Sequence, residues 1–177
     1  LNSKQKDEET NPPQKAKKKY IFALPGNHDW YGGLYAFREY FCGKRKYEGY
    51  FSQQTSSYYA INVIGDVWIW MVDIQLSLDI NKAQIAYFTN LCKEQNRKSS
   101  KDKTLQIILC IAQPFWFQKS VDVEDQLFNV IDNFITQVFF NNNPFTSVDK
   151  SGKSVNLFLE LKLIITGDIH HYTRFQM

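Results

Sequence analysis

The 177-residue sequence predicts an α/β domain, because short apolar runs typical of strands alternate along the chain with segments of helical periodicity. The apolar runs end at turn-forming residues such as Pro, Gly, Asn and Asp. A hydrophobic content of 44%, of which aromatic residues are a large part, is sufficient for a core in one domain of this size. These three observations favour a globular fold over a disordered chain.

Residues 1–19 are predicted to be a flexible linker, and residues 20–177 the folded part. The linker consists largely of Lys, Glu, Asp, Gln, Asn and Pro, and such a composition cannot offset the entropy cost of ordering. A polar linker followed at once by a buried strand is an unusual start for a domain. We therefore expect the chain to be the C-terminal part of a longer domain.

The first predicted elements are a buried strand and a short helix. An apolar run over residues 20–24 ends at Pro25-Gly26, a pair typical of a sharp loop. Apolar side chains then recur at helical spacing around residues 34–41.

A β-hairpin is predicted next, from the apolar runs over residues 58–64 and 67–72. Gly65-Asp66 separates the two runs, and glycine at the first central position suits a type II′ turn.

A second helix and a buried strand follow the hairpin. Apolar periodicity over residues 85–92 predicts the helix, with Asp79 and Asn81 as candidate N-caps. Residues 105–112 form a near-continuous apolar run, which is typical of a strand covered on both faces, and the run stops at Gln113.

The remaining elements are a long helix, a polar loop and a last strand. Residues 124–140 carry apolar side chains on one face, and Asp122 is placed to cap this helix. Residues 141–154 are polar and are predicted to be a loop. The strand over residues 157–165 then runs into Gly167.

Composition excludes some classes of protein and favours others. The longest apolar runs are far shorter than the roughly 20 residues of a membrane-spanning helix, so no membrane segment is predicted in this chain. Three cysteines without a C-x-x-C pair suit a reducing compartment and favour a cytoplasmic location. The net charge of +3 owes much to one local cluster of lysines, so a nucleic-acid partner is not favoured: Lys15, Lys17, Lys18 and Lys19.

The three histidines fall in two short segments, each directly after a predicted strand. The segments are Gly-Asn-His-Asp at residues 26–29 and Gly-Asp-Ile-His-His at residues 167–171. In open α/β sheets, sites collect at the carboxyl ends of strands, and imidazole, carboxylate and amide oxygen all bind Zn, Mn or Fe. Together the two segments predict a metal or phosphate site. Asp73, which follows another strand, is open to the same interpretation, although a local turn role is simpler for it.

The two segments resemble motifs of the calcineurin-like metallophosphoesterases. Residues 24–31, Leu-Pro-Gly-Asn-His-Asp-Trp-Tyr, resemble the G-N-H-[DE] block. Residues 167–172 resemble the block that most of the superfamily writes G-H-x-H, in a branch that writes G-D-x-H-H-Y. Residues 58–60 and 68–75 are similar to intermediate strands of that branch. The order and spacing of the blocks, over about residues 20–174, is more specific than either motif alone.

The resemblance implies a layered α/β/β/α sandwich that hydrolyses phosphate monoesters or diesters with two divalent metal ions, Mn, Fe or Zn. It implies that Asn27 ligates one metal, that His170 ligates the other, and that Asp168 stands where the family usually has a histidine ligand. His28 would contact the phosphoryl oxygens or protonate the leaving group. Arg174 would face the phosphate, although a surface position is the simpler interpretation, and no role transfers to His171.

Two departures from the family pattern affect the predicted site. Gln113 stands where the family commonly has a metal-binding histidine, and a neutral amide is a weaker ligand. The D-x-H and G-D blocks, which supply the bridging carboxylate, do not precede Gly26. We therefore expect the first strands of the fold to be absent from this chain and the chain by itself to be inactive.

Two other functions stay open on the sequence alone. A non-catalytic binding module could have kept the fold while losing ligands, as Gln113 and Asp168 would indicate, and metal content would distinguish it from an enzyme. A nucleic-acid-binding domain could use the lysine cluster with exposed aromatic residues such as Trp30 and Tyr31. Such binding would weaken steeply with salt.

Overall fold

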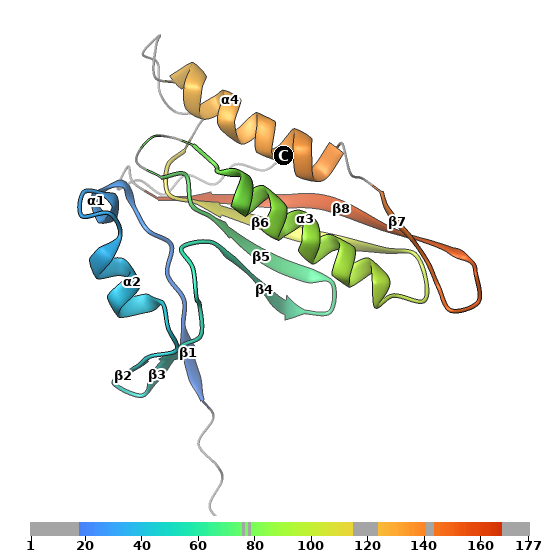
Figure 1. Cartoon of the computed structure of the whole chain (residues 1–177), viewed down its shortest axis with the longest axis horizontal. Helices are drawn as coiled ribbons and strands as arrows, with labels where there is room; N and C mark the ends of the chain where they lie inside the picture. The colour runs from blue at the N-terminus through green and yellow to red at the C-terminus, as the bar shows by residue number, and fades with distance from the viewer. Residues whose placement is uncertain (1–17, 76, 78, 115–123, 141–143, 168–177) are drawn as a thin grey trace, which may run out of the picture.

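A computed structural model describes residues 18–75, 77, 79–114, 124–140 and 144–167 and shows helices packed on a mixed sheet (Figure 1). The α/β class predicted from the sequence is confirmed. The strands are β1 (Lys19–Ile21), β2 (Lys46–Tyr47), β3 (Tyr50–Ser52), β4 (Tyr59–Ile64), β5 (Val67–Val72), β6 (Lys103–Ile111), β7 (Phe145–Val148) and β8 (Ser154–Thr166). The helices are α1 (Asn27–Trp30), α2 (Tyr35–Phe41), α3 (Lys82–Arg97) and α4 (Glu124–Ile135), which continues as the π-helix η1 (Thr136–Phe140).

The larger sheet has five strands in the order β4-β5-β6-β8-β7. Strands β5, β6 and β8 are parallel, whereas β4 and β7 run antiparallel to their neighbours at the two edges. The carboxyl ends of the three parallel strands therefore meet at one end of the sheet.

Helices α3 and α4 cover one face of this sheet (Figure 1). Trp70 of β5 stacks on Phe88 of α3 with 4.7 Å between ring centroids, and Phe88 meets Phe134 of α4 edge to face at 5.6 Å. All three side chains are almost completely buried. Burying a side chain of this size stabilises a fold by about 1.5–3 kcal/mol relative to its exposure, so this aromatic layer fixes both helices on the sheet.

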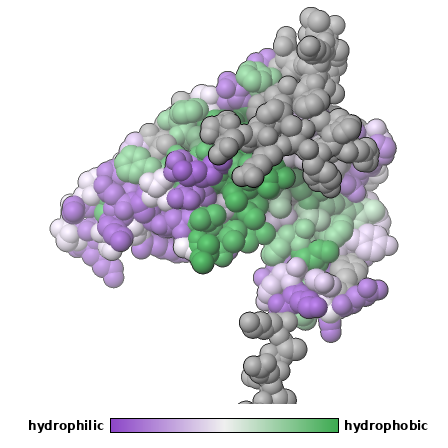
Figure 2. All heavy atoms as spheres, turned by 180° about the vertical axis from the view of Figure 1, so that it is seen from behind, coloured by the Kyte–Doolittle hydropathy of each residue, from purple (hydrophilic) through white to green (hydrophobic). Residues whose placement is uncertain are grey.

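The opposite face of the sheet carries apolar side chains that are open to solvent (Figure 2). Phe158 and Ile165 of β8 are 39% and 48% exposed. The prediction that residues 105–112 are covered on both faces is therefore wrong for part of β6. Leu105 and Leu109 are buried under the helices, but Gln106 faces solvent.

A second, three-stranded sheet has the order β1-β3-β2, with β1 parallel to β3. The prediction of a buried strand over residues 20–24 is wrong in extent and in burial, because β1 ends at Ile21 and Tyr20 is 45% exposed. The ammonium group of Lys19 lies 5.5 Å from the centre of the Tyr50 ring, a cation–π contact at the surface of this sheet.

The predicted hairpin and second helix are confirmed. Gly65 has a φ of 53° between β4 and β5, and a positive φ at this first turn position is what a type II′ turn requires. Asn81 is the N-cap of α3, because its side chain accepts a hydrogen bond from the Gln84 N–H at 3.1 Å. Asp79 instead donates its N–H to the Ile74 carbonyl.

Between residues 124 and 167 the structure differs from the prediction by one additional strand. The helix over residues 124–140 is confirmed, with a π-helical last turn, whereas Asp122 lies outside the described residues. The prediction of a loop over residues 141–154 is wrong, because β7 lies within it and pairs with β8. Buried Asn96 of α3 supports β7, since its Nδ2 donates to the carbonyls of Phe145 and Val155.

Candidate metal and phosphate site

Three parallel strands end side by side at the candidate site. Val72 of β5 pairs with Ile111 of β6, and Ile111 pairs with Thr166 of β8. The next residue of each strand therefore leaves the sheet at the same level. The Gly167 N–H donates to the Ala112 carbonyl at 3.2 Å, and a Cβ at position 167 would lie only 3.3 Å from that oxygen. Glycine thus permits a close approach of the β6 and β8 ends.

Gln54 holds the segment between β1 and α1 in place at this end of the larger sheet. Its side chain accepts the Ala23 N–H at 2.8 Å and donates to the Ala23 carbonyl at 3.1 Å. Phe22 packs against Tyr59 of β4, with 5.5 Å between ring centroids. These contacts fix the position of the residues that lead to buried Pro25 and to α1.

Local hydrogen bonds shape the turn that bears Asn27 and His28. The Gly26 N–H donates to Oδ2 of Asp29 at 2.8 Å, and the His28 N–H donates to Oδ1 of Asn27 at 2.9 Å. Asp29 is exposed and serves as a local cap of this turn.

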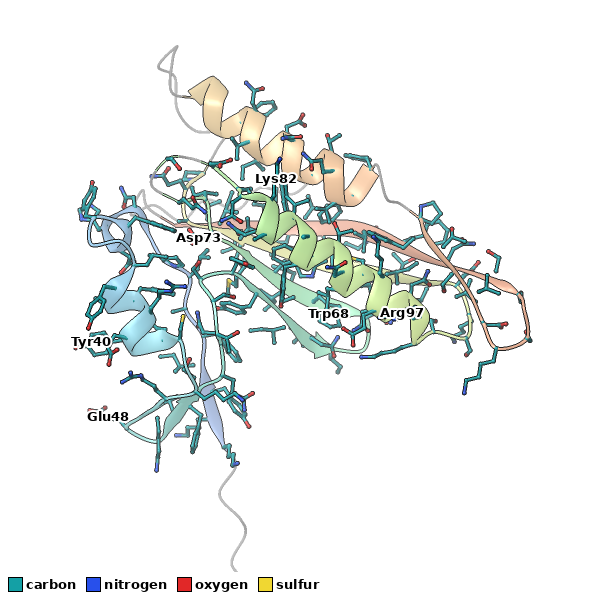
Figure 3. All side chains as sticks on the ribbon, in the orientation of Figure 1. Tyr40, Glu48, Trp68, Asp73, Lys82 and Arg97 are labelled. Carbon is teal, nitrogen blue, oxygen red and sulfur yellow. The ribbon has the colours of Figure 1, made fainter. Side chains whose placement is uncertain are left out.

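Asp73 joins this turn to the end of β5. Its Oδ1 accepts hydrogen bonds from the Trp30 indole N–H and from the Gln75 N–H, both at 3.0 Å. Gln84 of α3 clamps the Asp73 backbone by accepting its N–H at 3.0 Å and donating to its carbonyl at 2.6 Å. Asp73 is 1% exposed, and Figure 3 shows it beyond β5, next to the α1 segment.

A cleft with a volume of about 10 Å³ lies where these segments meet. Residues with amide or carboxyl side chains from three separate segments line it, namely Asn27, Asp73 and Gln113. Its other lining residues are Pro25, Gly26, Trp30, Ile74, Gln75 and Ala112.

The carboxyl of Asp73 is in an unusual electrostatic setting. Burial raises its pKa, hydrogen bonding from Ser57, Gln75 and Trp30 opposes the rise, and the nearby charge of Asp29 adds to it. Oδ2 is buried and, although Ser57 lies near the carboxyl, makes no hydrogen bond of ordinary length and angle with a described residue. Gln75 adopts a φ of 56°, a left-handed conformation that is uncommon for a residue other than glycine. Such outliers cluster at functional sites.

A profile of one protein family, described as calcineurin-like phosphoesterase, matches residues 3–172. The chain belongs to the calcineurin-like phosphoesterase family. No curated protein and no solved structure matches the chain. The match confirms the resemblance seen in the sequence and supports, in general terms, a metal-dependent phosphoesterase that acts on phosphate esters. Within the described part of the chain, no helix has the length and apolar character needed to cross a membrane.

His28 of this calcineurin-like phosphoesterase lies at the surface. Its side chain is exposed, its ring centroid is 5.0 Å from that of Tyr31, and it is not one of the residues that line the cleft. The imidazole is therefore open to solvent next to the cleft and is not enclosed within it.

Trp30 is not an exposed aromatic residue, contrary to the prediction made with the nucleic-acid alternative. Its ring is partly buried and its indole N–H is bound to Asp73. Tyr31, in contrast, is 66% exposed, as expected.

The described residues fit part of a metal centre. Oxygen atoms of Asn27, Asp73 and Gln113 are ligands that hard divalent cations accept, and the unpartnered Oδ2 of Asp73 is a buried acceptor that a cation would satisfy. Within the described ranges, no three His, Cys, Asp or Glu side chains come together in a metal-binding group. The predicted ligands Asp168 and His170, and also His171 and Arg174, lie outside those ranges.

Asp73 has one sequence signal in common with the motif residues, since it directly follows a strand of the parallel set. Its bond to Trp30, distant in sequence, could not be seen from that signal.

Proposed function

We propose that this protein is a metal-dependent phosphoric ester hydrolase whose catalytic centre lies at the carboxyl ends of β5, β6 and β8. The observation that carries the proposal is the cleft shared by Asn27, Asp73 and Gln113, in a chain of the calcineurin-like phosphoesterase family. Gly167 brings the chain to the same end of the sheet just before Asp168. Concave sites at strand ends of α/β sheets are where ligands commonly bind.

Each motif residue is given a separate role in this proposal. Asn27, Asp168 and His170 would hold two divalent ions, Mn, Fe or Zn. When bound, the ions would supply a water-derived nucleophile at neutral pH and neutralise charge on the phosphoryl oxygens. His28 would donate a proton to the leaving-group oxygen, a role that its exposed imidazole can fill beside the cleft.

The experiment is a comparison of two asparagine variants in the full gene product. Asn27→Ala removes a cleft amide, whereas Asn90→Ala removes an exposed amide from α3 as a matched control. We expect Asn27→Ala to lower both bound metal and the hydrolysis of aryl phosphate mono- and diesters, and Asn90→Ala to change neither. Equal turnover in the two variants would rule out the proposed centre.

A non-catalytic binding module is the second candidate, and the position of Gln113 in the cleft is the observation that favours it. An amide in place of an imidazole weakens the hold on a transition metal. Stoichiometric metal binding by the full gene product without turnover of any aryl phosphate would select this candidate.

A further inference from the structure

We propose that Asp73 is a direct ligand of a divalent cation in the cleft, where its carboxylate joins the amide oxygens of Asn27 and Gln113. The inference rests on the proposed function, because it places the cation in the same centre. It assigns Asp73 a role that neither the motifs nor the family match provides, and it predicts an all-oxygen site for a hard cation such as Mg²⁺ or Mn²⁺.

The first step is the orphaned oxygen of Asp73. Buried carboxylates are normally paired, fully hydrogen-bonded or bound to a metal, because an unpaired charge loses its hydration. Asp73 is 1% exposed, and its Oδ2, although Ser57 lies near the carboxyl, makes no hydrogen bond of ordinary length and angle with a described residue. A cation in the adjoining cleft would supply the missing partner.

The second step is that the carboxyl group is already held in place. Trp30 and Gln75 both donate to Oδ1, and Gln84 fixes the backbone of Asp73 from the other side. Ligands of metal sites are commonly oriented by such outer hydrogen bonds, which leave one oxygen free for the ion. The four contacts come from α1, the loop after β5, and α3, so the free oxygen belongs to a rigid part of the site.

The third step is the size and chemistry of the cleft. Its volume of about 10 Å³ is close to that of one water-sized sphere, enough for a single ion. Asn27 Oδ1 accepts the His28 N–H, and an amide oxygen retains a second lone pair for a cation. One carboxylate and two amide oxygens form a hard ligand set, which suits Mg²⁺ or Mn²⁺ better than a soft metal.

The test is a Mn²⁺ titration of the 177-residue chain, followed by electron paramagnetic resonance of the free ion. Asp73→Asn keeps the shape of the side chain and an acceptor for the Trp30 indole, but removes the charged oxygen. Asp29→Asn is the matched control, because it removes an equal charge from an exposed neighbour while leaving an amide oxygen that can still accept the Gly26 N–H. We expect Asp73→Asn to weaken Mn²⁺ binding by about tenfold or more, and Asp29→Asn to weaken it by less than about threefold.

Two controls separate binding from folding. The indole N–H resonance of Trp30, assigned with Trp30→Phe, should stay protected from exchange in Asp73→Asn. If that variant does not fold, Gln113→Met removes a cleft oxygen at similar side-chain length and should also weaken Mn²⁺ binding.

Three results would overturn the assignment. The first is unchanged Mn²⁺ affinity in Asp73→Asn, which would leave Asp73 as an anchor of Trp30 alone. The second is an equal loss in Asp73→Asn and Asp29→Asn, which would indicate a through-space charge effect. The third is a wild-type chain that binds no Mn²⁺ up to about 10 mM, well above the weakest dissociation constants of protein cation sites. Each of these results can occur while Asn27→Ala still lowers hydrolysis in the full gene product. The role of Asp73 and the proposed function are therefore tested independently.

Discussion

The indole N–H of Trp30 donates a 3.0 Å hydrogen bond to Oδ1 of Asp73, 43 positions further along the chain. This bond connects the turn that bears Asn27 and His28 to the end of β5. It joins the Gly-Asn-His-Asp turn to a carboxylate for which the family resemblance implies no role, and residues of both segments line the cleft.

Replacing Trp30 by Phe should therefore destabilise the fold. The variant keeps an aromatic ring but leaves buried Asp73 with one donor fewer, and an unsatisfied buried partner costs about 1–3 kcal/mol. The free energy of unfolding in urea measures this loss. Tyr31→Phe, at the exposed neighbouring position, should stay within about 0.5 kcal/mol of wild type. Equal stability of the two variants would mean that the bond contributes nothing.

His28→Ala should slow hydrolysis without removing metal. In the full gene product we expect kcat to fall by about 10²–10⁴, the usual effect of losing a positioned acid, while metal content stays nearly constant. Steady-state kinetics and elemental analysis of the same preparation make the comparison. Loss of metal would make His28 a ligand instead, and unchanged turnover would deny it a role.

Much of the fold follows from local sequence patterns. The hairpin at Gly65 and the cap at Asn81 are set by residues a few positions apart, and both were predicted. Strands β1 and β7 are short edge strands, and only their partners determine where they lie. No local pattern could place β1 in a separate sheet or find β7 within a polar segment.

In the candidate site, too, local features could be predicted from the sequence and long-range contacts could not. The Gly-Asn-His-Asp turn was visible in the sequence, because its hydrogen bonds join residues at most three positions apart. The contribution of Asp73 depends on Trp30 and on Gln84 of α3, which meet it only in the folded chain. Burial, and not sequence position, distinguishes Asp73 from an ordinary turn residue.

Asn96→Ala should be strongly destabilising, although the residue is far from any motif. Its Nδ2 donates to the carbonyls of Phe145 and Val155, so truncation removes two buried hydrogen bonds between α3 and the β7–β8 pair, and each typically contributes about 0.5–1.5 kcal/mol. Urea unfolding of Asn96→Ala should be compared with that of Asn90→Ala, an exposed position on the same helix. If the two unfold at the same urea concentration, Asn96 does not fasten α3 to the β7 edge.

Stability should fall at alkaline pH because of two buried thiols. Burial raises the pKa of Cys92 to about 12 and that of Cys110 to about 11, above the 9.0 of an unfolded cysteine. Between pH 9 and these values the unfolded chain releases thiol protons that the folded chain retains, so unfolding becomes easier as pH rises.

Thiol alkylation tests the same burial at fixed pH. Cys42 is only partly buried, and at pH 8 iodoacetamide should modify it first. Cys92 and Cys110 should react only in denaturant, as mass spectrometry of the intact chain would show. Rapid modification of all three thiols in the native state would contradict the burial of the other two.

The 177-residue chain by itself should bind at most one metal tightly enough to detect, and should not hydrolyse aryl phosphates. Two adjacent ions need a carboxylate that touches both and several further ligands for each. Asp73 cannot serve as that bridge with both oxygens, because its Oδ1 already accepts two N–H groups. Asn27 and Gln113 add only neutral amides, which leaves too little negative charge to hold two divalent ions together. Metal analysis and assays of mono- and diesters with added Mn²⁺, Fe²⁺ or Zn²⁺ give the answer. Two bound ions per chain with clear turnover would show that the ligand count is wrong.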